Sequence, residues 1–428
     1  MQKLILKYKS QTFAHLLSAI LLSSFYYIIQ FVFTKIISGK ISIADFGEYR
    51  YFFSILSFGA LFSIGFIDGF QIEWIVNKQP VNNKYISAAL IFTLLTSFVA
   101  FFLFDNIEIS MLAVINLVII NAGFILQYIF IKFNFFLFYL IPIIFSQFIQ
   151  ILIFEFLPGT VSLTEIFYIH TGLNFLFIIA VYIYCYQKKY IQTISSQIFN
   201  IKEIPRHIKN GLPILLSGIM LIGFLNIDKL ILKTGYLEND YGYYCFASLV
   251  AMVVYGVFAS VGNMLLKKMV DAKHIDKLYN NTIYFLMAIP FIVLLTKGIV
   301  IKGVEIFFSK YLDSIQYYIG FVNFYFPLLA NNLVILNTYK KHNQVTKFVL
   351  IAVVFLITQA ALLLWAKSSN MPLVNVPFLM ALVMGTWFFI NDFVLSYKDA
   401  ALGKKYWLRT AICLTGSILV FIISYNSK

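Results

Sequence analysis

The segment Asp45-Phe46-Gly47-Glu48-Tyr49 has a match in the second half of the chain, Asp240-Tyr241-Gly242-Tyr243-Tyr244. Each copy sits between two long apolar runs. The run after the first copy contains Phe62-Ser63-Ile64-Gly65, and the run after the second contains the similar Ala259-Ser260-Val261-Gly262. Matches in the same context indicate two related halves, and such halves within an apolar chain are typical of transport proteins. The sequence therefore predicts a transport machine rather than a receptor or an anchored enzyme.

The composition is that of a membrane protein. Hydrophobic residues make up 61% of the 428 residues and charged residues 12%, which is outside the range of water-soluble domains. The apolar residues come in runs of about 20, long enough to cross a bilayer core as helices. We expect an all-α polytopic membrane protein with 12 or 13 transmembrane helices. The expected spans are 13–36, 46–70, 85–104, 109–132, 135–156, 163–186, 212–234, 242–266, 278–300, 315–337, 345–366, 373–397 and 408–425.

The distribution of charge gives this map an orientation. With the amino terminus placed in the cytoplasm, most of the 32 Lys and Arg residues fall in inside segments, and most acidic loop residues fall outside. The net charge of +14 is then the signature of cytoplasmic loops beside anionic lipid headgroups. Nucleic acid is not an expected partner, because no hydrophilic domain exists to bind it.

The longest predicted loop divides the chain. We expect an N-lobe of six transmembrane helices over 1–187, a basic cytoplasmic linker over 188–211, and a C-lobe of six or seven helices over 212–428. An even number of spans in the first lobe gives both lobes the same orientation, so the repeats should be parallel. The isoleucine spacing between 191 and 201 fits an amphipathic helix on the membrane surface, and a solvated linker fits it equally.

The sequence contains no recognisable catalytic or metal-binding motif. The five His residues are spread over the whole chain, and the three Cys residues show no paired spacing. No phosphate loop, nucleophile elbow or paired-carboxylate motif is present, and no loop is long enough to fold as a catalytic domain. We therefore expect no enzymatic activity, no cofactor and no metal.

Two regions resemble a known family. The stretch from Ala44 to Tyr49, with Gly65-Phe66-Ile67-Asp68-Gly69 after it, resembles the second helix of bacterial polysaccharide and O-antigen flippases. Gly211-Leu212-Pro213-Ile214-Leu215-Leu216-Ser217-Gly218, followed by Asp228-Lys229-Leu230 and the pair Gly242 and Tyr244, resembles the start of their second lobe. That family belongs to the superfamily of multidrug, oligosaccharidyl-lipid and polysaccharide exporters.

The resemblance implies a V-shaped helical bundle of two lobes around a central cavity in the bacterial inner membrane. Its substrate would be an undecaprenyl-pyrophosphate-linked oligosaccharide, flipped to the outer leaflet by alternating access for O-antigen or capsule assembly. Membrane lipids would be the other partners. The resemblance leaves open whether a polysaccharide polymerase and a chain-length regulator act beside the protein. A thirteenth span would depart from the family pattern of twelve.

Polar residues inside the predicted span 46–70 are candidates for the substrate cavity. A charge within a span costs about 2.5–3.5 kcal/mol, so each needs a partner, a wet cavity or a function. Arg50 and Asp68 are separated by five helical turns and should share one face, with Ser54, Ser57 and Gln71 near it. We expect a polar stripe along this helix. Arg50 would contact the pyrophosphate or an acidic sugar, or else reach the outer headgroups or pair with an acid.

Three charged residues of the second half complete the candidate set, namely Asp228, Lys229 and Asp392. An intramembrane carboxylate can carry a proton or brace two helices. We expect bracing for Asp228, with a partner on another helix, because Lys229 at the next position cannot share its face. His170 is expected to be a hydrogen-bonded packing residue. Buried amides such as Gln127 suit sugar hydroxyls, although hydrogen bonds between helices are their default role.

Two rival functions remain. A drug or small-molecule antiporter of the same superfamily is disfavoured, because such proteins often carry an acidic residue in the first helix and 13–36 contains none. An integral-membrane glycan polymerase is disfavoured by the short outer loops. The sequence identifies neither the glycan nor the ion that drives movement.

Overall fold

The computed structural model describes residues 25–26, 28–133, 140–192, 203–259, 275–295, 297–342 and 344–412. Within these residues the regular structure is helical, apart from one isolated bridge between Asn82 and Gln192. This confirms the predicted all-α class. The chain divides into two compact units: unit 1 contains Met1–Ser42 and Tyr49–Asn226, and unit 2 contains Ile43–Glu48 and Ile227–Lys428. The helices α2 (Ile43–Ser57) and α8 (Ile204–Leu232) therefore each contribute residues to both units.

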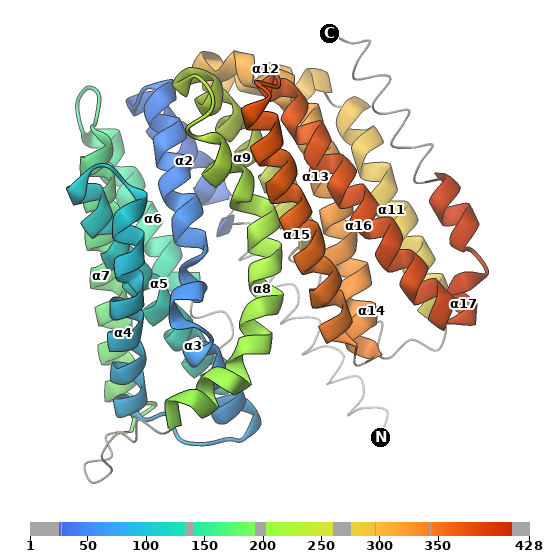
Figure 1. Cartoon of the computed structure of the whole chain (residues 1–428). Coiled ribbons are helices and arrows are strands. Elements are labelled where there is room, and N and C mark those ends of the chain that lie inside the picture. Colours follow the sequence, from blue (N-terminus) through green and yellow to red (C-terminus); the bar gives the residue numbers. More distant parts are fainter. Residues whose placement is uncertain are drawn as a thin grey trace, which may run out of the picture. The chain divides into compact units, whose positions relative to one another are not determined.

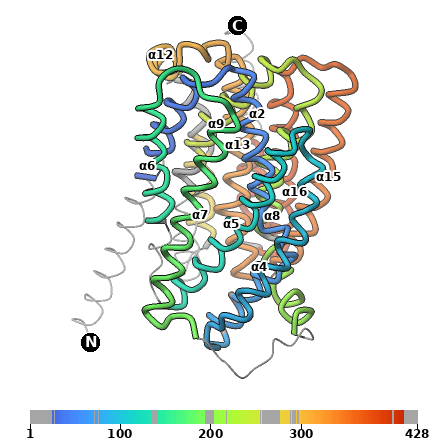
Figure 2. Tube along the Cα trace, turned by 90° about the vertical axis from the view of Figure 1, so that its left-hand side faces the viewer, coloured from blue at the N-terminus to red at the C-terminus, as the bar shows by residue number. Residues whose placement is uncertain are grey.

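Long helices side by side build unit 1 (Figures 1 and 2). They begin where polar side chains cap them: Asn82 before α4, Asn106 before α5, and Ser162 with Glu165 as a capping box before α7. Helix α5 packs against α4 and α7, and α6 packs against α7. The elements are η1 (Gly59–Ser63), α3 (Phe66–Phe70), η2 (Gln71–Val76), α4 (Asn83–Ser97), η3 (Phe98–Leu103), α5 (Ile107–Lys132), α6 (Leu140–Phe156) and α7 (Leu163–Gln187).

Unit 2 is built around α13 (Ile315–Ala330), whose residues from Tyr317 to Ala330 are buried except for Asn323. Helices α9, α11 and α16 pack against it. The other elements are α9 (Glu238–Ala259), α11 (Ile275–Leu295), α12 (Lys297–Phe308), η5 (Ser309–Ser314), η6 (Asn331–Ile335), α14 (Leu336–Lys341), α15 (Val345–Ser368), η7 (Leu373–Asn375), α16 (Val376–Lys398) and α17 (Ala400–Gly403).

The two matching segments of the sequence meet inside unit 2, and their glycines explain the contact. A Cβ added at Gly47 would lie 2.8 Å from Cδ1 of Tyr241 and 3.4 Å from the Cα of Gly242. A Cβ added at Gly242 would overlap the carbonyl oxygen of Ile43. Only glycine allows the two backbones to approach this closely. The repeated motif is therefore a packing motif in which each copy supplies the surface that the other requires.

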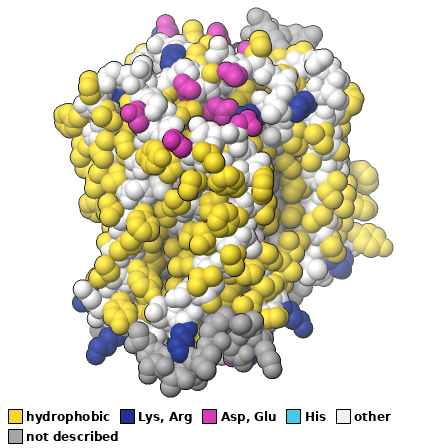
Figure 3. Space-filling model, turned by 60° about the vertical axis from the view of Figure 1, so that its left-hand side comes forward, with side chains coloured by type: hydrophobic (Ala, Val, Ile, Leu, Met, Phe, Trp, Pro, Cys, Tyr) yellow, Lys and Arg dark blue, Asp and Glu magenta, His cyan; other side chains and the backbone are white. Residues whose placement is uncertain are grey.

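The described helices fit a membrane. Six are long and apolar enough to cross one, and two bent pairs raise the number to eight if each pair is a single span. Large apolar side chains such as Phe102, which is 86% exposed, cover the surface between the two ends (Figure 3). The expected spans at 85–104, 109–132, 163–186, 345–366 and 373–397 coincide with such helices. Most of the expected spans 13–36 and 408–425 lies outside the described residues.

Two expectations about helix boundaries need correction. Helix α8 begins at Ile204, within the segment 188–211 expected to be a linker, and it is bent by 54° between Leu216 and Gly218. Residues 297–341 form one helical run in which the short helix α12 precedes α13, although 301–314 was expected to be a loop. Residues 193–202, which include most of the expected amphipathic segment, lie outside the described part.

Candidate functional site

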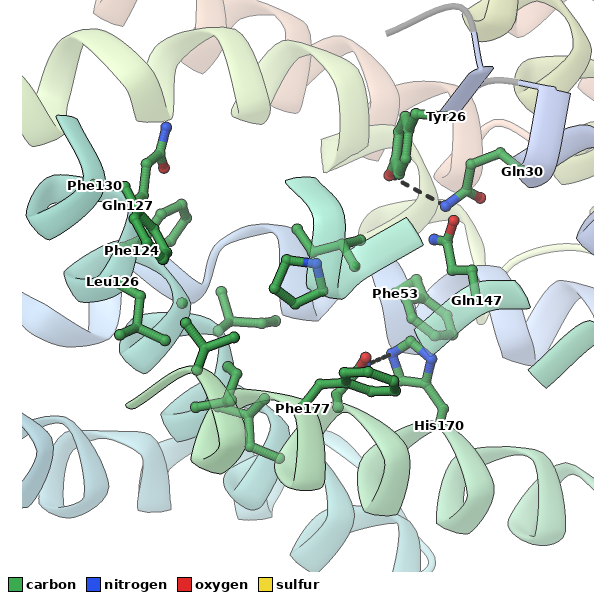
Figure 4. A pocket seen from close by; sticks show the side chains of 18 residues that line it. Tyr26, Gln30, Phe53, Phe124, Leu126, Gln127, Phe130, Gln147, His170 and Phe177 are labelled. Atoms are coloured by element: carbon green, nitrogen blue, oxygen red, sulfur yellow. Dashed lines mark hydrogen bonds between the residues drawn. The ribbon is translucent and has the colours of Figure 1, made fainter. Parts of the chain in front are cut away.

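A cavity of about 360 Å³ lies inside unit 1 (Figure 4). Helices α5, α6 and α7 supply most of its wall, α2 supplies Phe53, and the helical segment before α2 supplies Tyr26 and Gln30. Tyr26, Gln30, Gln147 and His170 lie on one side in Figure 4, and Gln127 lies opposite with Phe124 and Phe130. The volume is within the range of ligand pockets in proteins.

A closed ring of four hydrogen bonds joins α6 to α7 beside this cavity. Gln150 Nε2 donates to Ser146 Oγ at 3.0 Å, and Ser146 Oγ donates to Asn174 Oδ1 at 2.7 Å. Asn174 Nδ2 lies 2.9 Å from His170 Nε2, and His170 Nδ1 lies 3.1 Å from Gln150 Oε1. With Asn174 as donor, Nε2 must accept, so Nδ1 carries the proton and His170 is neutral. This ring supports the expectation that His170 is a hydrogen-bonded packing residue.

One polar atom beside the cavity has no partner among the described residues. Gln147 is 7% exposed, and its Oε1 atom is buried without a hydrogen-bond donor among the described residues. Beside it, Gln30 Nε2 donates to the hydroxyl of Tyr26 at 3.1 Å. An unsatisfied buried acceptor is unfavourable by about 1–3 kcal/mol. Gln147 lines the cavity, but its Oε1 atom is itself covered, so the side-chain amide has to rotate before a bound molecule can satisfy this acceptor.

The described residues that line the cavity carry no charge. Of its 18 lining residues none is Asp, Glu, Lys or Arg, and the remainder beyond the polar groups are aromatic, aliphatic, proline or glycine. The aromatic members are Tyr26, Phe53, Phe124, Phe130 and Phe177. Amide side chains with aromatic faces and no charge form a site for an uncharged molecule that has both polar and apolar surfaces. In the described part of the chain, no group of three His, Cys, Asp or Glu side chains could hold a metal ion.

The expected polar stripe along 46–70 is not continuous, because the helix is broken. Helix α2 ends at Ser57, and Ile64 and Gly65 have φ angles of 49° and 81° before α3 begins at Phe66. The two parts are bent by 58°. Face sharing across five turns requires an unbroken helix, so the spacing of Arg50 and Asp68 does not place them on one face.

The members of the stripe have separate environments. Ser54 Oγ donates to the carbonyl of Arg50 at 2.7 Å, and Ser57 Oγ donates to the carbonyl of Ser54 at 2.6 Å, so both hydroxyls are used within α2. Asp68 is buried and accepts from the hydroxyl of Tyr128 on α5 at 2.9 Å. The side chain of Gln71 lies outside the described part. Ser54, Ser57 and Asp68 are not among the residues that line the cavity.

Arg50 is half-buried in α2 and has no acidic partner among the described residues. Its Nε atom is buried without a hydrogen-bond acceptor in that part of the structure. The neighbouring Glu48 pairs with Lys233 instead, at 2.8 Å. The guanidinium of Arg50 is therefore available to an anion.

Asp228 and Lys229 form a buried pair, which corrects one expectation. Lys229 Nζ donates to both carboxylate oxygens of Asp228 at 3.1 Å, although the helical spacing was expected to separate them. The long lysine stem turns back to the adjacent residue. Tyr244 on α9 also donates to Asp228 at 2.8 Å. The carboxylate thus braces α8 against α9, and both charges are occupied by protein partners rather than open to a substrate.

Asp392 belongs to a second buried cluster in unit 2. Arg409 Nη2 lies 2.9 Å from Asp392 Oδ1, and its Nε lies 3.2 Å from Oδ2, which makes the pair bidentate. The remaining N–H groups of Arg409 donate to Asn280 Oδ1, Ser396 Oγ and the carbonyl of Leu402. Tyr279 donates to Asp392 at 2.7 Å. Because every partner is provided by the protein, Asp392 holds helices together and is not exposed to a substrate.

Sequence patterns pointed only partly to the residues that line the cavity. The polar residues in and beside the cavity stand within apolar spans, where an interhelical hydrogen bond was the expected role. Two pairs in the hydrogen-bond ring have the spacing i, i+4 that places them on one helix face. These pairs are Ser146 with Gln150 and His170 with Asn174. The spacing did not indicate that the two pairs bond to each other or that Gln147 Oε1 lacks a donor among the described residues.

The chain matches no family model and no curated protein sequence. Solved transporter structures are similar to it in fold. A multidrug-resistance transporter of the MATE family, in the MOP superfamily, in an inward-facing conformation is 12% identical with a TM-score of 0.66, and the match covers 88% of this chain and 96% of that one. The lipid II flippase MurJ in an inward closed conformation is 16% identical with a TM-score of 0.56 and 99% of both chains covered.

A MOP-superfamily transporter from Pyrococcus furiosus is 12% identical to this chain, with a TM-score of 0.54, and the match covers 90% of this chain and 94% of that one. At these identities the similarity shows the fold alone. The chain therefore has the polytopic helical fold of MOP-superfamily transporters.

Proposed function

We propose that this chain is a flippase of the bacterial inner membrane that translocates a polyprenyl-pyrophosphate-linked oligosaccharide for O-antigen or capsule assembly, by alternating access. The cavity in unit 1 carries this proposal, because its wall combines amides and aromatic rings without charge. Sugar rings present hydroxyl groups to amides and apolar faces to aromatic rings. The fold shared with a lipid II flippase over 99% of both chains supports a lipid-linked substrate.

The pyrophosphate requires a separate contact, and Arg50 is our proposed site for it. A guanidinium binds phosphate oxygens in a bidentate manner, and that of Arg50 lacks an acidic partner in the described part. In this proposal the sequence halves 1–187 and 212–428 act as the two moving lobes, with the amino terminus in the cytoplasm. Arg50→Ala should abolish most export at normal protein level, whereas Arg50→Lys should retain part of it. Full export by Arg50→Ala would exclude the role.

The charge of the cavity separates this proposal from a drug antiporter. A site for cationic drugs or for coupling protons needs a carboxylate, and none of the described residues that line this cavity is Asp or Glu. The buried carboxylates Asp228 and Asp392 are engaged by Lys229 and Arg409.

Deletion of the gene in its native host tests the proposal. Lipid-linked intermediates would be radiolabelled and assayed in each leaflet of the inner membrane. We expect complete, unpolymerised repeat units to accumulate on the inner face, and a plasmid copy should reverse this. Single repeat units on the outer face would instead indicate a polymerase, and unchanged intermediates with normal surface glycan would indicate an antiporter.

A further inference from the structure

We propose that the cavity in unit 1 binds an uncharged sugar ring of the substrate and excludes both the pyrophosphate and the polyprenyl chain. This inference rests on the proposed function and assigns one part of the substrate to one set of residues. It starts from the size of the cavity. A volume of about 360 Å³ corresponds to about a dozen water-sized groups. One hexose has about that many non-hydrogen atoms, so the cavity has room for a sugar ring.

The charge of the wall excludes an ionic occupant. A pyrophosphate buried here would face no cation, because none of the 18 lining residues is Lys or Arg. A buried anion without a partner is strongly unfavourable. A cation buried here would also lack a partner, because none of the 18 lining residues is Asp or Glu. The occupant must therefore be neutral.

The polar groups exclude a purely apolar occupant. A prenyl chain in the cavity would leave Gln147 Oε1 buried without a donor and would remove water from the amide groups of Gln30 and Gln127. After rotation of the Gln147 amide toward the cavity, a sugar hydroxyl or acetamido N–H satisfies this acceptor. The rings of Phe53 and Phe177 offer apolar surfaces to the sugar C–H groups.

The ring of hydrogen bonds beside the cavity divides its polar groups into two classes. His170 and Asn174 bond to Gln150 and Ser146 and hold α6 against α7. Gln147, one residue after Ser146, is outside that ring. We therefore assign recognition of the sugar to Gln147, with Gln30 and Gln127, and assign positioning of the wall to His170 and Asn174.

Photo-crosslinking from adjacent positions of α7 tests this inference. Benzoylphenylalanine would replace Phe177, which lines the cavity, or Leu176, which is 62% exposed and outside it. The full-length protein in liposomes would be irradiated with tritiated undecaprenyl pyrophosphate, either bare or carrying one N-acetylglucosamine. Position 177 should label the sugar-bearing lipid about fivefold more than the bare lipid, the ratio that one net hydrogen bond gives. Position 176 should label both equally.

Gln147→Leu in the position 177 background should bring the labelling ratio close to one without changing the labelling from position 176. Equal labelling of both lipids at position 177 would overturn the inference, as would labelling from position 176 alone. Since crosslinking measures binding and not translocation, its failure leaves the deletion experiment unaffected. Conversely, unchanged intermediates in the deletion strain would refute the proposed flippase function. The crosslinking result would still show whether the cavity binds the sugar.

Discussion

The two units differ in the charge of the polar side chains that they bury. Unit 2 is filled around α13 and contains two buried ion pairs, Asp228 with Lys229 and Asp392 with Arg409. Unit 1 contains a cavity whose polar groups are neutral, and its buried acids Asp68 and Glu73 are not among the lining residues. Ion pairs that are fully satisfied fix neighbouring helices, whereas neutral amides can exchange a protein partner or water for a ligand. We propose on this basis that unit 2 is the rigid unit and unit 1 the binding unit.

The largest expected effect of a substitution is at Arg409. Arg409→Ala leaves the carboxylate of Asp392 buried without its cation, and we expect a loss of about 3–5 kcal/mol of stability. Thermal unfolding of the purified protein in detergent, followed by intrinsic fluorescence, measures it. Lys405→Ala is the control, because Lys405 is exposed, and should leave the Tm unchanged.

A double variant sharpens this prediction. Replacing both Asp392 and Arg409 by Leu removes both charges at once, so it should recover part of the stability lost by Arg409→Ala. If Arg409→Ala unfolded at the same temperature as the native protein, the pair would not be a stabilising element of unit 2.

The glycine contact within unit 2 should give the next largest effect. Gly242→Ala places a methyl group on the backbone carbonyl of Ile43, which cannot rotate away, so we expect a loss of about 3 kcal/mol. Gly47→Ala meets the side chain of Tyr241, which can shift, and should cost about 1 kcal/mol. Gly172→Ala on α7 has open space and serves as the control. A larger loss for Gly47→Ala than for Gly242→Ala in Tm measurements would contradict the contact described.

A smaller loss is expected when the hydrogen-bond ring of unit 1 is opened. His170→Phe leaves Asn174 Nδ2 and Gln150 Oε1 without partners, which should destabilise the protein by about 2 kcal/mol. His342→Phe, at an exposed position, is the matched control and should be neutral in the same unfolding measurement. An unchanged Tm for His170→Phe would mean that the ring does not hold α6 against α7.

The smallest effect on stability is expected at Gln147. Gln147→Leu removes a buried acceptor that has no donor in the described residues, so the free energy of unfolding should stay within about 0.5 kcal/mol of the native value or rise slightly. A marked fall in Tm would show that Gln147 has a structural role, and its assignment to ligand recognition would then be wrong.

Long apolar runs made several helices predictable. The breaks within helices and the contacts between distant residues did not follow from those runs. Helices α5 and α15 were predicted from hydropathy alone, because a run of that length crosses a bilayer only as a helix. The break at Ile64 and Gly65 was missed because hydropathy does not report φ angles, even though the glycine is a signal for a turn.

The candidate site was predicted less well than the fold. Helical spacing predicted that Lys229 and Asp228 point to different faces of α8. The flexible side chain of Lys229 instead bends back, and its Nζ donates to Asp228. The partner of Asp392 could not be predicted, because Arg409 lies beyond the end of α16 and approaches it only in the folded unit. The sequence analysis offered intramembrane charges as candidates for the substrate cavity, whereas the described residues that line the cavity of unit 1 are uncharged, Gln147 among them.

The most direct test of the account compares two buried glutamines in a translocation assay. Gln147 borders the cavity of unit 1, and Gln359 on α15 of unit 2 is 1% exposed. Each would be replaced by Leu in the complemented deletion strain, and lipid-linked repeat units would be assayed in both leaflets at matched protein levels. We predict that Gln147→Leu accumulates repeat units on the inner face while Gln359→Leu does not. Equal translocation by the two variants would contradict the assignment of substrate binding to unit 1.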